Sequence, residues 1–147
     1  MLPPFDAFGR LPPGVHWAEW GEVYQRFGWN EHRRRLLAGL LRALQNLRDA
    51  GCRVAYLDGS FVTAKDLPGD FDGCWDLTGV DLAKVDRVLR TFSHQRALQK
   101  AKYLGELFPS RLQADAVGRT FLEFFQVDKS TGDAKGIVAL LLQGLPR

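Results

Sequence analysis

Hydrophobic residues along the chain recur with two different periods, and these periods predict a mixture of helices and strands. The clearest helix covers residues 31–50, where leucines three or four positions apart form one apolar stripe. Asn30 before this stretch is a typical helix N-cap, and Gly51 after it is a typical helix stop. A second apolar stripe at helical spacing predicts a shorter helix over residues 17–27.

Short apolar runs bounded by turn residues predict strands between the helices. The expected strands cover residues 53–57, 70–77, 111–117 and 136–142. Further helices are expected over 81–92 and 93–104. Thr120, followed three residues later by Glu123, forms a capping-box pattern that opens a short phenylalanine-rich helix. Because helices and strands mix without an internal repeat, the expected class is α/β or α+β, with a short mixed sheet flanked by helices.

The first residues of the chain have a different composition. Residues 1–16 hold four of the seven prolines, which predicts an extended arm rather than a helix. The arm also carries large apolar side chains such as Phe5 and Leu11, so we expect it to pack along the surface of the domain. We therefore divide the chain into a proline-rich arm with a short helix, residues 1–28, and a main domain, residues 29–147.

Composition limits the class of protein. With 147 residues, of which 46% are hydrophobic and 25% charged, the chain fits one globular domain. No apolar run approaches the ~20 residues of a membrane helix, and the N-terminus lacks the pattern of a secretory signal. Two cysteines, Cys52 and Cys74, do not form a disulfide framework or a four-ligand zinc site, so we expect buried thiols in a cytoplasmic protein. The net charge of +3 does not by itself indicate nucleic-acid binding.

Two aspartates separated by one residue form a candidate metal site. Asp70 and Asp72 fall within the expected strand 70–77, with Phe71 between them. The alternation of a strand places both aspartates on one face, about 7 Å apart along the chain. Such hard oxygen ligands suit Mg²⁺ or Mn²⁺, which combine a few carboxylates with phosphate oxygens.

A turn of small residues precedes this pair. Strand 53–57 runs toward Gly59-Ser60, and Ser60 lies ten residues before Asp70. Gly59 lets the backbone approach a polyphosphate closely, Ser60 offers a hydroxyl and an N–H group, and Lys65 can reach the same anion. These three residues are our candidates for nucleotide binding, although Lys65 fits equally well as a solvated lysine.

Together these residues resemble the nucleotidyltransferase superfamily related to DNA polymerase β, whose signature is an apolar strand, Gly-Ser, a spacer of this length and Asp-x-Asp. The resemblance implies that the paired aspartates bind two metal ions and that Gly59 and Ser60 hold a nucleoside triphosphate. It also implies a third catalytic and metal-binding acid on a later strand, for which Asp115 is our candidate. Asp76 is the rival, but it lies only four residues after Asp72, which is too near for the family pattern.

A closer resemblance links nearly the whole chain to a small uncharacterised bacterial and phage family of nucleotidyltransferase-like proteins. The similar segments are 11–16, 58–65, 121–126 and 135–138. The resemblance implies an enzyme that transfers a nucleoside monophosphate from a triphosphate such as ATP to a hydroxyl group of RNA or protein. Similar small proteins are linked to toxin–antitoxin and phage-defence loci, so an inactive interaction module with the same fold is the alternative. The expected elements include no sizeable C-terminal helical domain, which makes a partner protein or RNA a candidate for completing the site.

Arginines are concentrated near the start of the expected 31–50 helix. Residues 32–35 read His-Arg-Arg-Arg, and Arg42 and Arg48 follow on the same helix. Such a patch can track an RNA backbone, which gives a third interpretation of the chain as an RNA-binding protein. The alternative is the solvated face of an amphipathic helix, and the sequence leaves both open.

Overall fold

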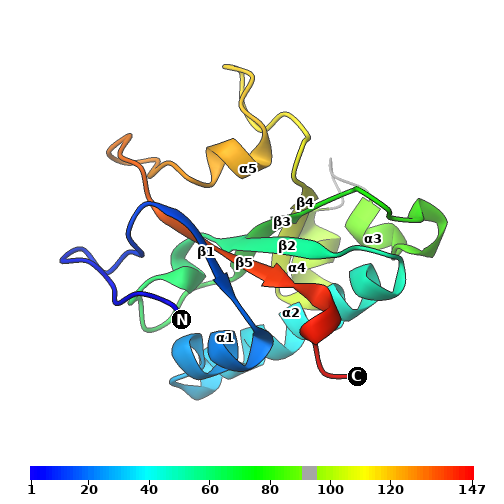
Figure 1. Ribbon diagram of the computed structural model, residues 1–147, viewed down its shortest axis with the longest axis horizontal. Helices are drawn as coiled ribbons and strands as arrows, with labels where there is room; N and C mark the ends of the chain where they lie inside the picture. The colour runs from blue at the N-terminus through cyan, green and yellow to red at the C-terminus, as the bar shows by residue number, and fades with distance from the viewer. Residues whose placement is uncertain (91–95) are drawn as a thin grey trace.

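The computed structural model describes residues 1–90 and 96–147, and it contains one mixed five-stranded sheet (Figure 1). The strands are β1 (Gly14–Ala18), β2 (Val54–Asp58), β3 (Phe71–Trp75), β4 (Gly105–Pro109) and β5 (Gly136–Leu141). Their order across the sheet is β1-β5-β2-β3-β4, with the two outer pairs parallel and the two inner pairs antiparallel. The expected short mixed sheet flanked by helices is confirmed.

Helices cover the two faces of this sheet unequally. They are α1 (Trp20–Phe27), α2 (Glu31–Asp49), α3 (Arg87–Arg90), α4 (Arg96–Tyr103) and α5 (Phe121–Phe124). In Figure 1, α1 and α2 lie on one side of the sheet and the short α5 lies on the other. Two helices begin as predicted, because Asn30 accepts a hydrogen bond from the Arg33 N–H and the Thr120–Glu123 capping box is formed. Within residues 1–90 and 96–147, no helix has the length and apolar character needed to cross a bilayer.

Strand alternation divides the core into two parts. Leu57 on β2 and Leu107 on β4 belong to the main core, in which most of the leucine stripe of α2 is fully buried. Cys74 and Phe108 point to the opposite face and form a smaller cluster with Phe125 at the end of α5. Burying one large apolar side chain contributes about 1.5–3 kcal/mol. The main core therefore fixes the sheet on α2, and the smaller cluster holds the segment that carries α5.

The N-terminal segment is built into the fold more deeply than a surface arm. Gly14–Ala18 forms β1 and pairs in parallel with β5 at one edge of the sheet. Leu2 and Leu11 are buried in the main core, and Arg26 of α1 donates hydrogen bonds to the carbonyl oxygens of Leu2 and Pro3. Because three of the five β1 residues are exposed, this strand lacks the apolar alternation by which a sequence reveals a strand.

Two expected elements before α5 differ from the structure. The predicted strand over 111–117 is wrong, because these residues form a turn, while β4 lies earlier at Gly105–Pro109. The predicted helix over 81–92 is reduced to a 3₁₀ turn at Leu82–Lys84 and the four-residue α3. Phe92, Ser93 and His94, at the junction of the two helices expected here, lie outside the described residues.

The two thiols of the chain are not joined. Cys52 and Cys74 are both free and buried, as the sequence predicts. Burial raises the pKa of the Cys52 thiol to about 11, so this thiol is protonated at neutral pH. Both cysteines therefore act as small apolar residues of the core.

Candidate active site

Three carboxylates lie side by side across the sheet. Asp58, Asp72 and Glu106 occupy matching register positions on β2, β3 and β4, so they project from the same face. Asp70 lies just before β3, and ligand oxygens of Asp70, Asp72 and Glu106 are within 4.8 Å of one another. The structure therefore brings the predicted aspartate pair together and adds a glutamate from β4.

Asp115, the residue expected to be the third acid, does not belong to this group. It lies in the turn before α5, where one of its oxygens accepts hydrogen bonds from the N–H groups of Val117, Gly118 and Arg119. Its other oxygen lies 2.7 Å from the Arg119 guanidinium. Because local contacts already satisfy this carboxylate, the third position beside the aspartates falls to Glu106, which sequence reasoning missed.

Burial and mutual repulsion shift the titration of these acids. Burial, followed by the negative charges of Asp70, Glu106 and Asp58, raises the pKa of Asp72 to about 7. Burial also raises the pKa of Asp58 to about 6, although the nearby Lys135 ammonium opposes the shift. Carboxylates held close together in this way are common at functional sites, because folding alone does not favour them.

We call Asp70, Asp72 and Glu106 the acidic group. A cation on α4 reaches it. The ammonium of Lys100 lies 3.1 Å from a carboxylate oxygen of Glu106 and 3.4 Å from one of Asp70. The Glu106 side chain is 3% exposed, whereas the Lys100 side chain is about half exposed. In the part of the chain that the structure describes, no ion pair involves Asp72. The Lys100 ammonium therefore lies between Glu106 and Asp70 and does not pair with Asp72.

The turn after β2 brings the backbone against Asp72. Gly59 has a φ of +77°, which residues other than glycine rarely adopt. A Cβ atom at this position would lie 2.6 Å from Oδ2 of Asp72 and would clash with it. Both the backbone conformation and this close approach therefore require glycine. Ser60 follows and begins a single 3₁₀ turn, Ser60–Val62.

A buried arginine fixes the loop that follows Ser60. Arg33 on α2 is fully buried and donates five hydrogen bonds to main-chain carbonyl oxygens. The accepting residues are Phe27, Phe61, Thr63 and Lys65. The guanidinium also lies 3.7 Å from the centre of the Trp29 ring, and burial lowers its pKa to about 10. Arg33 thus sets the course of the chain from the Ser60 turn to Lys65.

The arginine patch predicted on α2 is largely used within the fold. Arg33 is buried, and Arg42 and Arg48 donate hydrogen bonds to main-chain carbonyls of neighbouring segments. Arg35 is exposed, as expected for the solvated face of an amphipathic helix. The patch is therefore not a continuous row of arginines open to an RNA backbone.

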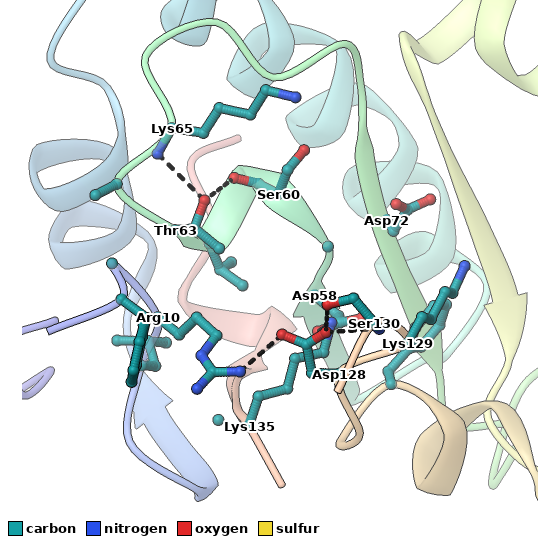
Figure 2. A pocket seen from close by; sticks show the side chains of 18 residues that line it. Arg10, Asp58, Ser60, Thr63, Lys65, Asp72, Asp128, Lys129, Ser130 and Lys135 are labelled. Atoms are coloured by element: carbon teal, nitrogen blue, oxygen red, sulfur yellow. Dashed lines mark hydrogen bonds and ion pairs between the residues drawn. The ribbon is translucent and has the colours of Figure 1, made fainter. Parts of the chain in front are cut away.

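A cavity of about 710 Å³ opens beside the Gly59-Ser60 turn (Figure 2). The predicted nucleotide-binding residues Gly59, Ser60 and Lys65 all line it, and Asp72 borders it. Further cations from distant parts of the chain complete the lining, namely Arg10, Lys129 and Lys135. Sequence reasoning missed these three, because only the folded chain brings them to the Ser60 turn.

Ion pairs occupy some of these cations and leave others available. The Arg10 guanidinium lies 2.7 Å from Asp128, and the Lys135 ammonium lies 3.4 Å from Asp58 (Figure 2). Lys65 and Lys129 take part in no ion pair within the described residues. The cavity therefore offers at least two ammonium groups to an anionic ligand.

A second, smaller cavity lies on the side of Asp70. It has a volume of about 440 Å³, and its polar lining residues are His32, Arg35, Asp70 and Lys100. Asp72 borders the first cavity and Asp70 borders the second. The acidic group therefore lies between the two cavities, with one aspartate at the border of each.

Comparison with known proteins gives a family and no activity. A family model described as a family of unknown function, DUF6932, matches residues 3–141. No curated protein and no solved structure matches the chain significantly.

Proposed function

The chain belongs to the family of unknown function DUF6932, and from the geometry of its site we propose that it is a metal-dependent nucleotidyltransferase. The proposed reaction transfers a nucleoside monophosphate from a nucleoside triphosphate to a hydroxyl group of RNA or protein. The observation that carries the proposal is the convergence of Asp70, Asp72 and Glu106 within 4.8 Å. This group lies against the Gly59 turn and at the border of a cation-lined cavity.

The donor set of the acidic group suits Mg²⁺ or Mn²⁺. Asp70, Asp72 and Glu106 supply only carboxylate oxygens, which are the ligands that hard divalent cations prefer. These three residues would hold the metal, whose charge would stabilise the Asp72 carboxylate against the burial and repulsion that raise its pKa. When bound, such an ion polarises phosphate oxygens and stabilises the departing pyrophosphate.

The triphosphate fits the larger cavity. Gly59 and Ser60 line this cavity, so a phosphate group can reach the backbone of their turn, and Ser60 adds a hydroxyl. The Thr63 hydroxyl donates a 2.6 Å hydrogen bond to the Ser60 carbonyl oxygen and so fixes this turn. Lys65 and Lys129 supply positive charge toward a highly charged anion.

The smaller cavity gives the acceptor hydroxyl its own approach. It borders Asp70, whereas the larger cavity borders Asp72, so donor and acceptor would meet at the aspartate pair from two directions. Holding two reactants in a fixed relative orientation is a large part of the rate enhancement in group transfer. This arrangement supports transfer to a second molecule rather than binding of a nucleotide alone.

Transfer of label tests the proposal. Wild-type protein is incubated with each of the four nucleoside triphosphates, labelled at the α-phosphate, with Mg²⁺ or Mn²⁺ and either RNA or protein acceptors. We expect labelled acceptor, and we expect its loss in Asp70→Asn, Asp72→Asn and Glu106→Gln. Asp115→Asn is the matched control, because this acid lies outside the group. Absence of label on every acceptor with the wild-type protein would contradict the proposal.

A second candidate function is an inactive interaction module, such as a toxin–antitoxin or phage-defence component. The observation that favours it is the Lys100 ammonium, which contacts Glu106 and Asp70 where a metal ion would bind. Calorimetric titration with Mn²⁺ separates the two functions. Metal binding by the wild-type protein, strengthened severalfold in Lys100→Ala, favours the enzyme, whereas metal binding by the variant alone favours the module. Lys102→Ala is the control, because Lys102 lies on the same helix and pairs with Asp86 instead.

A further inference from the structure

The N-terminal segment places an exposed aromatic ring at the larger cavity. Phe8 lines this cavity, and 81% of the residue is exposed to solvent. The other aromatic residue in the lining, Phe125, is buried and belongs to the smaller core cluster. Phe8 is therefore the ring that a ligand in the cavity can cover.

Phe8 lies on a turn that is closed by several hydrogen bonds. One carboxylate oxygen of Asp6 accepts from the N–H groups of Phe8 and Arg10, at 2.8 and 3.0 Å. The Asp6 N–H donates to the Arg10 carbonyl oxygen at 2.7 Å, and the Gly9 N–H donates to the Asp6 carbonyl oxygen at 3.0 Å. The φ of Gly9 is +76°, which suits glycine at this position of the turn. The backbone that carries the ring is thus well defined.

The same turn is attached to both walls of the cavity. The Gly9 carbonyl oxygen accepts a 2.9 Å hydrogen bond from the N–H of Ala64, in the loop that follows Ser60. On the other side, the Arg10 guanidinium lies 2.7 Å from Asp128. The position of the Phe8 backbone is therefore fixed relative to the proposed phosphate site, which reduces the entropy lost when a ligand binds.

We propose that the nucleobase of the bound triphosphate stacks on the ring of Phe8. This inference rests on the proposed nucleotidyltransferase function and names the group that binds the base. The Arg10 guanidinium lies 5.2 Å from the centre of the Phe8 ring and adds a cation beside the stacked pair. Since every base has a flat face, stacking of this kind accepts different bases with modest preference.

Two ligands separate the base contact from the phosphate contacts. Isothermal titration calorimetry in the presence of Mg²⁺ compares ATP with inorganic tripolyphosphate, which has the phosphates but no base. The variants are Phe8→Ala, which removes the ring, and Phe8→Trp, which keeps an aromatic face. Tyr24→Ala is the matched control, because Tyr24 is an exposed aromatic residue on α1 that does not line the cavity.

The expected result is a selective loss of ATP binding. Phe8→Ala should weaken ATP binding about tenfold or more and leave tripolyphosphate binding unchanged, and Phe8→Trp should retain ATP binding. If Phe8→Ala binds ATP as tightly as the wild-type protein does, the stacking inference is wrong and the proposed function stands. If the wild-type protein binds neither ligand, the proposed function and the inference that rests on it both fail.

Discussion

Replacing Asp72 with asparagine should stabilise the protein in the absence of metal. Burial raises the pKa of Asp72 most, and repulsion by the charges of Asp70, Glu106 and Asp58 raises it further. Asparagine has nearly the same shape and carries no charge, so Asp72→Asn removes this repulsion and leaves the packing of β3 unchanged. Removing a repelled and partly buried charge should therefore increase the free energy of unfolding.

The distance between the carboxylates gives the size of the repulsion, and the pKa shift of Asp72 gives burial and repulsion together. Two unit charges within 4.8 Å of each other repel by about 3.5 kcal/mol or more at an effective dielectric constant of 20. The rise of the Asp72 pKa from 3.8 to about 7 corresponds to about 4 kcal/mol at 1.36 kcal/mol per pKa unit. Because Asp72 is only partly buried and Lys100 supplies a counter-charge, solvent and ions screen much of this. We expect a measured gain of about 1–3 kcal/mol.

The sign of the pH dependence follows from the raised pKa. The folded protein holds the Asp72 proton more tightly than the unfolded chain does, so the destabilisation is nearly absent below pH 4. It grows between pH 4 and pH 7 as the folded protein is forced to ionise, and it is complete above pH 7. The gain from Asp72→Asn should therefore be full at pH 8 and much smaller at pH 4.5.

Urea unfolding with a chelator at pH 8 and pH 4.5 measures both values. Asp49→Asn is the control, because Asp49 is an exposed carboxylate beside Arg48 and its removal should change stability by less than about 0.5 kcal/mol. The reasoning fails if Asp72→Asn is less stable than the wild-type protein at pH 8. It also fails if the variant gains the same free energy at both pH values.

Three further results are expected from the same geometry. Arg33→Met should lower the free energy of unfolding by about 3–5 kcal/mol in urea titrations, because it leaves buried carbonyl oxygens without donors, whereas Arg34→Met at an exposed position should have little effect. Glu106→Gln should weaken Mn²⁺ binding about tenfold or more in calorimetry, whereas Asp115→Asn should leave it unchanged. If Asp115→Asn weakens binding and Glu106→Gln does not, Asp115 and not Glu106 is the ligand. Adding Mg²⁺ at pH 8 should raise the melting temperature of the wild-type protein and not that of Asp72→Asn, and an equal rise in both would place the bound ion elsewhere.

Local signals predicted the elements whose structure is determined by neighbouring residues. The N-cap at Asn30 and the leucine stripe define α2, and the alternation around Asp70 and Asp72 defines the start of β3. Gly59 was expected to admit a polyphosphate, whereas the structure shows Asp72 close to this backbone and a φ that favours glycine. These features depend on spacings of a few residues, which a sequence displays directly.

The features that could not be predicted depend on contacts between distant residues. β4 is buried at all five positions, so it shows no alternation, and the register that places Glu106 beside Asp72 exists only in the folded sheet. Arg10 and Asp128 form their ion pair across 118 positions of the chain. Asp115 illustrates the opposite error, because the Arg119 side chain and three nearby N–H groups satisfy it locally. A carboxylate at a plausible spacing can therefore be assigned to a site only when its contacts in the folded chain are known.

The proposed metal ion would contact more of the acidic group than Lys100 does. The Lys100 ammonium contacts Glu106 and Asp70 but leaves Asp72 without an ion pair in the described part of the chain. A divalent ion carries twice the charge and can accept oxygens from all three acids at once, since these lie within 4.8 Å. The Lys100 side chain is half exposed, so it can move into solvent if a metal ion takes its place beside the buried Glu106 carboxylate. Under the proposed function, Lys100 is therefore a counterion of the acidic group that a metal ion would displace.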